Sequence, residues 1–374
     1  MRTPNFWPRA GSRGRVVPAT ALLLALSLSA LIVGCGTAAE PSADRSDESA
    51  PADSAASPVG VEVIAEGLDA PWSVAFHNGT ALISERDTAR ILELGLDGGT
   101  STVATIDGVS AVGEAGLLGL AARDARLYVY STATGGNRIQ RYPIEGAPGG
   151  LRLGEPTLVF DGIPAANYHD GGRIAFGPDG MLYVTTGDAG NPGSAQELGS
   201  VSGKILRLTP DGEVPQDNPF PGSPVYSLGH RNPQGIAWDD DGTMYAAEFG
   251  QNTWDELNII EAGGNYGWPE VEGLGGGDRY IDPVQQWQPR HASPSGIAVY
   301  DGSVWIANLR GERLLQVPLS DLGSSTEHLG DRGRLRDVVV GHDGTLWVLT
   351  NNTDGRGDPQ PGDDHLLRFT PDSD

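Results

Sequence analysis

The sequence contains almost no cysteine, because Cys35 is the single one among 374 residues. A lone cysteine excludes a disulfide within the chain and a metal site built from several thiolates. Basic residues are also few, with 25 Lys and Arg against 49 Asp and Glu, and the formal net charge is −24. Binding of nucleic acid needs a basic surface, so we expect no nucleic-acid partner.

Long amphipathic helices are missing too. After the first 34 residues, no apolar pattern of helical period extends beyond two turns. The chain is instead rich in turn-forming residues, with 54 glycines and 27 prolines. The roughly 320 residues after the leader are enough for one large domain of short strands and turns.

One pattern occurs six times: a short apolar strand, a tight turn, a second strand, a loop and a third strand. The expected first strands are 72–76, 116–121, 172–176, 235–238, 296–300 and 336–340. The expected second strands are 81–84, 127–131, 181–185, 244–247, 304–307 and 346–350. The expected third strands are 90–94, 138–142, 204–208, 256–260, 313–317 and 365–369.

The turns between first and second strands carry a common signal, since Asn-Gly and Asp-Gly tolerate the positive φ of tight hairpins. They are Asn78-Gly79, Asp179-Gly180, Asp241-Gly242, Asp301-Gly302 and Asp343-Gly344. The second repeat departs from this, with Arg123-Asp124 at the turn. Repeats spaced by roughly 40–60 residues suit four-stranded blades, so we predict an all-β fold, a six-bladed β-propeller over 59–374. A stacked β-sandwich is the alternative.

The topology of a propeller predicts which loops share one face of the molecule. The first strand of each blade is innermost, and the chain reverses at each hairpin. The loops entering the first strands and the loops between second and third strands therefore share one face, which we call the upper face.

The N-terminus has the features of an export signal. Residues 1–34 combine a basic start with an apolar run from Ala19 to Val33, followed by Cys35, and this resembles a bacterial lipoprotein signal. The run is too short for a comfortable membrane span. We expect cleavage before Cys35, a lipid on Cys35, a disordered linker over 35–58, and anchoring at the outer face of a bacterial cell membrane.

His169 is the candidate acid–base group of the upper face. It lies in Tyr168-His169-Asp170-Gly171-Gly172, in the loop entering the third blade. A histidine can take a proton near neutral pH, and the two glycines would let a ligand approach the backbone closely. Taken alone, His169 is better explained as a histidine satisfied by its neighbours in a turn.

Four arginines are expected on the same face: Arg231, Arg310, Arg334 and Arg336. Guanidinium groups match planar carboxylates with paired hydrogen bonds, so a ring of them suggests a ligand with several carboxylates. The alternative is that each arginine pairs with a nearby acid such as Asp337 or Glu312. Carbonyls and acids in 248–258 and 263–269 could also hold calcium, although no EF-hand spacing is present.

The sequence around these residues resembles the soluble quinoprotein glucose and aldose sugar dehydrogenases, which use pyrroloquinoline quinone (PQQ). The similarity extends over about 67–370 and is densest in 113–119, 169–188, 203–210, 230–238, 248–269, 295–296 and 334–338. The family fold is a six-bladed propeller, in agreement with the count of repeats.

The resemblance implies roles for individual residues. His169 would be the catalytic histidine, with Arg231 and Asn232 near the reactive carbonyl of the quinone. Arg334 and Arg336 would bind the carboxylates of the quinone. The resemblance also assigns Glu114 and Arg310 to the cofactor, where the glucose enzymes have glutamine and lysine, and Tyr168 stands where they have an acid. Backbone carbonyls of Gly250 and Gln251 would bind calcium, Glu256 and Tyr266 would form a second calcium site, and Trp287 is a candidate substrate-side aromatic.

The implied reaction is oxidation of an aldose at C1 to a lactone. His169 would act as general base on the anomeric hydroxyl, with hydride passing to the quinone, calcium polarising its carbonyl and Arg231 stabilising the charge that develops. The electrons would pass to an unidentified acceptor. Two alternatives remain: a calcium-dependent hydrolase of sugar lactones, and a non-catalytic surface propeller that binds a ligand or protein.

Overall fold

A computed structural model describes residues 60–371 of the chain. The expected signal at 1–34 and the linker at 35–58 lie outside the described residues. Within the described part, strands dominate and the two helices are short 3-10 turns, η1 (Pro192–Gln196) and η2 (Gly277–Arg279). None of these helices is long and apolar enough to cross a membrane.

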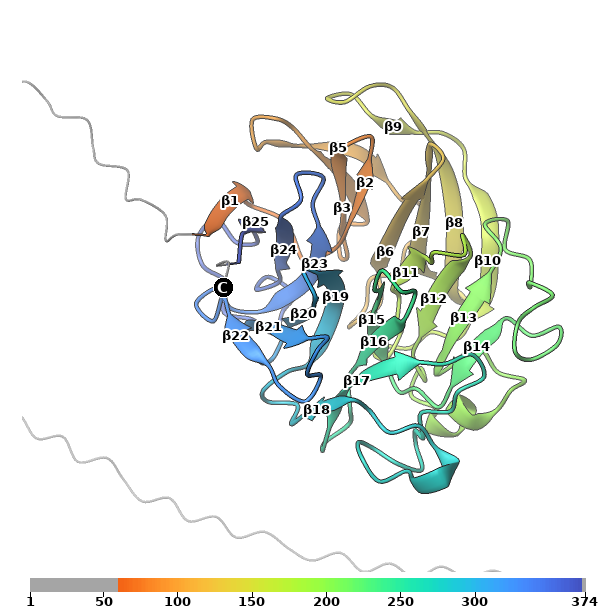
Figure 1. The fold of residues 1–374 in the computed structure, drawn as a ribbon. Helices are drawn as coiled ribbons and strands as arrows, with labels where there is room; N and C mark the ends of the chain where they lie inside the picture. The colour runs from red at the N-terminus through yellow and green to blue at the C-terminus, as the bar shows by residue number, and fades with distance from the viewer. Residues whose placement is uncertain (1–59, 372–374) are drawn as a thin grey trace, which may run out of the picture. The chain divides into compact units, whose positions relative to one another are not determined.

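The strands form six antiparallel sheets arranged around a centre (Figure 1). Blade 1 consists of β2 (Pro71–His77), β3 (Thr80–Glu85), β4 (Arg90–Leu94) and β5 (Thr100–Thr105). Blade 2 consists of β6 (Leu117–Arg123), β7 (Arg126–Ala133), β8 (Gly136–Glu145) and β10 (Thr157–Ile163), with the short β9 (Arg152–Leu153) paired to β8. Blade 3 consists of β11 (Ile174–Phe176), β12 (Leu182–Thr186), β13 (Lys204–Leu208) and β14 (Val225–Leu228).

Blade 4 consists of β15 (Pro233–Trp238), β16 (Met244–Glu248), β17 (Asp255–Ile260) and β18 (Gln285–Trp287). Blade 5 consists of β19 (Pro294–Tyr300), β20 (Ser303–Asn308), β21 (Arg313–Pro318) and β22 (Thr326–His328). Blade 6 consists of β23 (Leu335–Val340), β24 (Leu346–Thr350), β25 (Leu366–Phe369) and β1 (Val61–Ala65). The prediction of a six-bladed propeller is confirmed, and the sandwich is excluded.

The ring is closed by the first strand of the described chain. β1 pairs antiparallel with β25, with Val61 opposite Phe369 and Val63 opposite Leu367. In Figure 1 the orange β1 accordingly lies beside the blue strands of blade 6. The innermost strands β2, β6, β11, β15, β19 and β23 contact one another in sequence, and β23 returns to β2.

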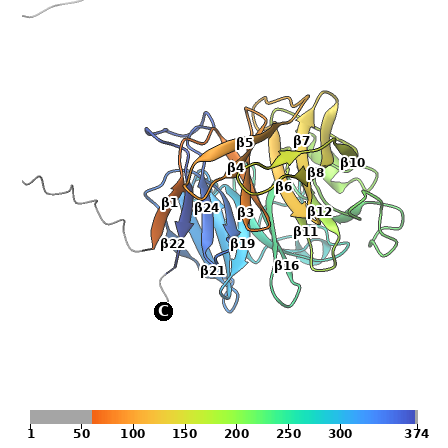
Figure 2. The same cartoon turned by 90° about the horizontal axis from the view of Figure 1, so that it is seen from above.

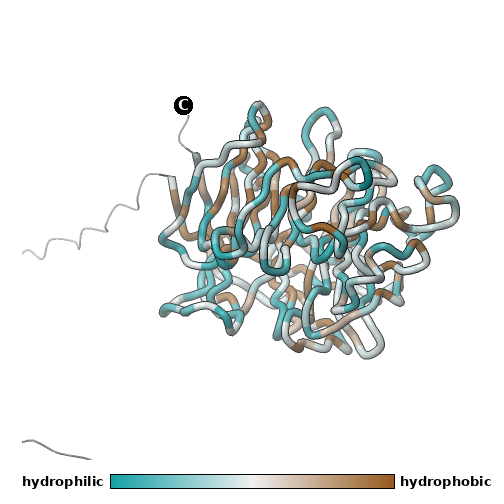
Figure 3. Tube along the Cα trace, turned by 90° about the horizontal axis from the view of Figure 1, so that it is seen from below, coloured by the Kyte–Doolittle hydropathy of each residue, from teal (hydrophilic) through white to brown (hydrophobic). Residues whose placement is uncertain are grey.

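The hydrophobic core is divided among the junctions between blades. Six clusters of buried side chains each join mainly one pair of neighbouring blades. Trp305 and Phe369, for example, hold blade 5 against blade 6. Figure 3 shows the apolar strands in brown and the polar connecting loops in teal. Because the packing at these junctions stabilises the fold, the connecting loops can carry polar groups.

The turn of blade 2 shows how a hairpin forms without glycine. Asp124 and Ala125 both adopt positive φ, at 49° and 55°, so the turn lies one residue later than expected. In the view from above (Figure 2), the hairpins of several blades extend from the ring of strands. Because each blade repeats the same order of strands, the corresponding loops of all six blades lie on the same face.

Candidate functional site

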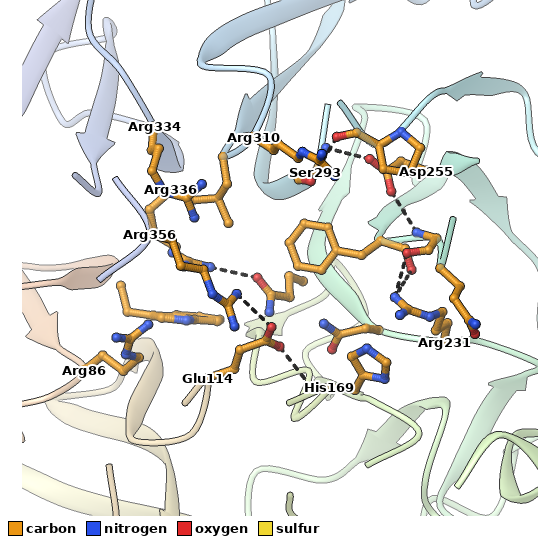
Figure 4. Close-up of a pocket in the computed structure, with 18 residues that line it drawn as sticks. Arg86, Glu114, His169, Arg231, Asp255, Ser293, Arg310, Arg334, Arg336 and Arg356 are labelled. Carbon is orange, nitrogen blue, oxygen red and sulfur yellow. Dashed lines mark hydrogen bonds and ion pairs between the residues drawn. The ribbon is translucent and has the colours of Figure 1, made fainter. Parts of the chain in front are cut away.

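A cavity of about 480 Å³ opens where the upper-face loops meet (Figure 4). Its lining comes from the two classes of loop that the topology predicts to share a face. Residues at or before the first strands contribute Trp72, Glu114, His169, Arg231, Asn232, Gln234, Pro289, Ser293, Arg334 and Arg336. Loops between second and third strands contribute Arg86, Phe249, Gly250, Gln251, Leu309, Arg310 and Arg356, and Asp255 begins a third strand.

The structure brings together most of the residues expected at the site. His169, Arg231, Asn232, Glu114, Arg310, Arg334, Arg336, Gly250 and Gln251 all line this cavity. Glu256 and Tyr266 do not, and line a smaller cavity beside it. Trp287 contacts neither cavity and is half-buried in the packing between blades 4 and 5. The expectation that Trp287 faces the substrate is therefore wrong, because its side chain completes the apolar junction.

The cavity is strongly cationic in an acidic protein. Six arginines line it, against two acids, Glu114 and Asp255. Within the described residues, Nε of Arg231, Nε of Arg334 and Nδ2 of Asn232 are buried without a hydrogen-bond partner. Buried donors are nearly always satisfied in folded proteins. These donors therefore mark a place for an acceptor-rich ligand.

The arginines do not pair with the acids suggested by sequence proximity. Arg334 donates to Asp354 at 2.8 Å, and Arg336 lies 3.8 Å from the same carboxylate. Asp337 instead pairs with Arg173 at 3.0 Å. One carboxylate thus serves two guanidinium groups, and positive charge remains in excess.

Arg336 shows the electrostatic consequence most clearly. Burial lowers the pKa of its guanidinium to about 9, because the opposing effect of Asp354 is smaller and the cations Arg86 and Arg334 act in the same direction as burial. A buried cation of this kind is stabilised by a nearby anion. An anionic ligand in the cavity would provide one.

The indole of Trp72 belongs to the lining of the cavity and is almost fully buried. Arg173 lies over its ring at 4.4 Å from the ring centroid, and Arg336 lies at 5.8 Å. Arg173 is fixed in turn by Asp337 and by the carbonyl of Gln234 at 2.9 Å. The ring of Trp72 is thus already covered by a cation, and it is the guanidinium groups of the cavity that suit a polyanion.

His169 is oriented by an aspartate that the sequence did not single out. Its Nδ1 lies 2.7 Å from Oδ1 of Asp188, whose carboxylate also accepts from Nε1 of Trp268 at 2.9 Å and from the N–H of Gly190 at 2.8 Å. Burial alone would raise the pKa of Asp188, but these hydrogen bonds and the charge of His169 bring it below the usual value. An ionised Asp188 only accepts, so Nδ1 carries the proton and Nε2 is the free basic nitrogen.

The backbone of His169 is held in a left-handed conformation, with φ of 62°. Its N–H donates to Oε2 of Glu114 at 3.0 Å, and its carbonyl accepts from the N–H of Ala189 at 3.2 Å. A Cβ on Gly187 would lie 1.9 Å from that carbonyl, so only glycine allows this approach. The loop is therefore packed as a unit around the histidine.

Glu114 links His169 to the mouth of the cavity. Its other oxygen accepts from Arg356 at 2.9 Å. Burial would raise the pKa of Glu114, but the hydrogen bonds from His169 and Arg356 bring it below the usual value. An ionised Glu114 thus anchors both the histidine loop and an arginine whose side chain is half exposed.

Gly171 and Gly172 do not line the cavity. A Cβ on Gly171 would lie 2.5 Å from the carbonyl of Thr185, and one on Gly172 would lie 2.6 Å from the side chain of Leu118. The expectation that they admit a ligand to the backbone is wrong. Gly171 allows close packing within the third blade, and Gly172 allows that blade to approach Leu118 of the second.

Gly250 and Gln251 lie on a loop that is clamped from two sides. Oε1 of Glu272 accepts from four successive N–H groups, those of Gln251, Asn252, Thr253 and Trp254, at 2.7–3.1 Å. Asp255 accepts from the N–H of Gly250 at 2.8 Å, and Arg231 donates to the carbonyl of Gly250 at 2.7 Å. Burial raises the pKa of Asp255 to about 6, against the lowering effect of its hydrogen bonds.

The smaller cavity, of about 10 Å³, lies behind this loop and is lined by Glu248, Glu256, Glu272 and Tyr266 among others. Burial and the charge of Glu248 raise the pKa of Glu256 to about 8. The hydroxyl of Tyr266 donates to the carbonyl of Ile259 at 2.6 Å. No group of three or more His, Cys, Asp or Glu side chains within the described residues is arranged to hold a metal.

Sequence reasoning missed Arg86, Arg356, Asp188 and Trp72. Arg86, Asp188 and Arg356 each follow a second strand, in the class of loop already expected at the upper face. Their position after a second strand was the sequence signal that could have identified all three. Trp72 lies inside an apolar strand and carries no such signal.

Comparison with known proteins agrees with this site. A model of the glucose / sorbosone dehydrogenase family matches residues 68–367. A PQQ-bound aldose sugar dehydrogenase from Streptomyces coelicolor has a similar structure, with 51% identity and a TM-score of 0.79, covering 82% of this chain and 97% of that one.

Two curated relatives are also similar. Aldose sugar dehydrogenase YliI of Escherichia coli K12 is 29% identical over 79% of this chain and 91% of that protein. Quinoprotein glucose dehydrogenase B of Acinetobacter calcoaceticus is 34% identical over 57% of this chain and about half, 52%, of its own length. With its propeller, its cationic cavity and a family match over most of its length, the chain belongs to the glucose/sorbosone dehydrogenase family.

Proposed function

We propose that this protein oxidises aldose sugars at C1 to lactones, with PQQ as the cofactor. The observation that carries the proposal is the convergence of six guanidinium groups and the His169–Asp188 pair in one cavity. Two of the relatives named above are a PQQ-bound aldose sugar dehydrogenase and a quinoprotein glucose dehydrogenase, which supports the same reaction class.

The cavity suits a planar cofactor with several carboxylates. Arg310, Arg334 and Arg336 would bind the carboxylates, since guanidinium and carboxylate groups pair through two hydrogen bonds. Arg231 and Asn232 would use their unpaired donors on the polar edge of the cofactor. Glu114 would act beside them by holding Arg356.

PQQ would supply the two-electron acceptor for the reaction. The chain supplies the base: Nε2 of His169 takes the proton of the anomeric hydroxyl as the C1–H bond breaks and the lactone carbonyl forms. Asp188 accepts from Nδ1 throughout and stabilises the imidazolium that results. Arg231 adds positive charge where negative charge develops on oxygen.

Calcium is the second proposed cofactor. The carbonyls of Gly250 and Gln251 are hard oxygen donors of the kind that calcium prefers. Arg231 donates to the Gly250 carbonyl, so a calcium ion there would share this oxygen with a guanidinium and would need the anionic cofactor as a further ligand. Glu256 and Tyr266 would serve a second calcium site at the small cavity, although no three acids there converge on one metal position within the described residues.

The location of the protein is also a proposal. We infer that Cys35 carries a lipid and that the propeller is held at the outer face of a bacterial membrane, where it passes electrons to an acceptor. The basic and apolar leader before Cys35 supports this. Replacement of Cys35 by Ser should release the protein from the membrane fraction, and retention of the variant there would contradict the anchor.

Reconstitution tests the proposed reaction. Purified apoprotein is mixed with PQQ, calcium, an aldose and a dye acceptor, and dye reduction is followed. We expect reduction that requires PQQ, and we expect His169→Ala to lower kcat by at least about a hundredfold while PQQ remains bound. An unchanged kcat in His169→Ala would refute the role of the base.

The same mixture separates the alternatives. Lactone hydrolysis without PQQ would indicate the hydrolase, and the absence of any turnover would indicate a binding propeller. The cavity acids argue against the hydrolase, because Glu114 and Asp255 already accept hydrogen bonds from protein N–H groups instead of converging on one metal position.

A further inference from the structure

A second cleft adjoins the main cavity and has no role in the function proposed so far. Its volume is about 400 Å³, and Pro289 and Arg310 line both spaces. It also contains Arg290, Trp254 and two side-chain amides, those of Asn252 and Gln288. Because Pro289 and Arg310 belong to both linings, the cleft lies directly beside the main cavity.

The charge of the cleft is unusual for this chain. Two arginines line it and no acid does, although the sequence carries a net charge of −24. Within the described residues, neither Arg290 nor Arg310 forms an ion pair; Arg290 only donates through Nε to Nε2 of His291, at 2.8 Å. Both arginines are exposed, so their remaining donors are available to a ligand.

We propose that this cleft binds an anionic group of the aldose substrate, carried outside the sugar ring at C6. The inference rests on the proposed function, which places C1 beside His169. In a pyranose, C6 is attached to C5 outside the ring, so its substituent extends outward from the ring and need not share the position of C1 beside the base. A carboxylate or a phosphate at C6 would pair with Arg290, while Arg310, which we assign to the cofactor, adds positive charge at the shared wall. The amides of Asn252 and Gln288 can bond to the remaining oxygens of the anionic group.

The aromatic wall is consistent with a sugar in this position. The indole of Trp254 lines the cleft and offers an apolar surface for the C–H groups of a sugar ring. A neutral sugar would use this surface but would gain nothing from the arginines. The arginines therefore distinguish anionic aldoses from neutral ones.

The experiment compares three substrates on the holoenzyme reconstituted with PQQ and calcium: D-glucose, D-glucuronate and D-glucose 6-phosphate. The variant is Arg290→Gln, because Arg290 is exposed and lines only the cleft. Arg126→Gln is the matched control; it removes an exposed positive charge at the start of β7, on the opposite face of the propeller.

We expect Arg290→Gln to lower kcat/KM about tenfold for at least one anionic sugar, mainly through KM, and to leave glucose within about twofold. Arg126→Gln should change none of the three substrates. Raising the salt from about 20 mM to about 300 mM should weaken the anionic sugars only. The sugar that responds to the variant tells whether the cleft reads a carboxylate, a phosphate or both.

Failure of the cleft inference can be distinguished from failure of the proposed function. If glucose is oxidised and the anionic sugars are unaffected by Arg290→Gln, or all three sugars fall equally, the cleft inference is overturned and the proposed function stands. If none of the three sugars is oxidised, both are overturned.

Discussion

Replacing Asp188 by Asn changes one atom in the pair that orients His169. The two oxygens of Asp188 accept from three donors: the imidazole Nδ1, the N–H of Gly190 and the indole N–H of Trp268. An amide has only one acceptor oxygen. If that oxygen faces His169 and Gly190, the NH₂ group opposes Trp268 at about 2.9 Å; if it faces Trp268, the NH₂ group donates to Nδ1 and moves the ring proton to Nε2.

Either outcome weakens the base, and the structure gives the size of the effect. The Asp188 side chain is 1% exposed and that of His169 is 14% exposed, so solvent screens their contact little. A hydrogen bond to a charged group contributes about 1.5–3 kcal/mol. Loss of that stabilisation from the imidazolium in the transition state should lower kcat by roughly 10- to 150-fold.

The assay is dye reduction by the reconstituted enzyme at saturating glucose, with PQQ uptake measured separately by absorbance. We expect Asp188→Asn to bind PQQ with unchanged affinity and to turn over slowly. The double variant with His169→Ala should be no slower than His169→Ala alone, because Asp188 acts through the histidine. A normal kcat in Asp188→Asn, or additive losses in the double variant, would refute this reasoning.

Two other predictions concern charge. Burial and Glu248 raise the pKa of Glu256 from the usual 4.5 to about 8, so the folded protein retains a proton that the unfolded chain releases between these values. The free energy of unfolding of the calcium-free protein should therefore fall as the pH rises from about 5 to about 8, and Glu256→Gln should make that fall shallower in urea titrations; parallel slopes would count against it. Arg334→Gln removes a buried guanidinium whose Nε has no partner in the described chain, and should weaken PQQ binding at least about tenfold in an equilibrium titration, whereas unchanged affinity would exclude Arg334 as a ligand.

The inner part of each blade could be predicted from the sequence because its signals are local. Asn78-Gly79 and Asp301-Gly302 adopt the positive φ that their hairpins require, and the strands on either side alternate as expected. The outer strands could not be predicted in this way. β22 is three residues long and partly exposed, and β1 pairs with a strand about 300 residues away, so no local pattern marks either.

The residues of the site could likewise be predicted only in part. Loop placement alone brought His169, Arg231, Arg310, Arg334 and Arg336 to one face, since propeller topology fixes where such loops emerge. The partners of these residues depend on distances that the sequence does not contain. Arg334 pairs with Asp354 and not with an acid next to it in the sequence, and His169 pairs with Asp188.

An equilibrium titration of the apoprotein with PQQ and with the methyl ester of PQQ, at the same calcium concentration, tests the central claim most directly. Esterification removes the carboxylate charges and leaves the ring intact. If the guanidinium groups of the cavity hold a planar polyanion, PQQ should bind at least about a hundredfold more tightly than the ester, and added salt should narrow the difference. Equal affinities, or no uptake of PQQ with calcium present, would contradict it.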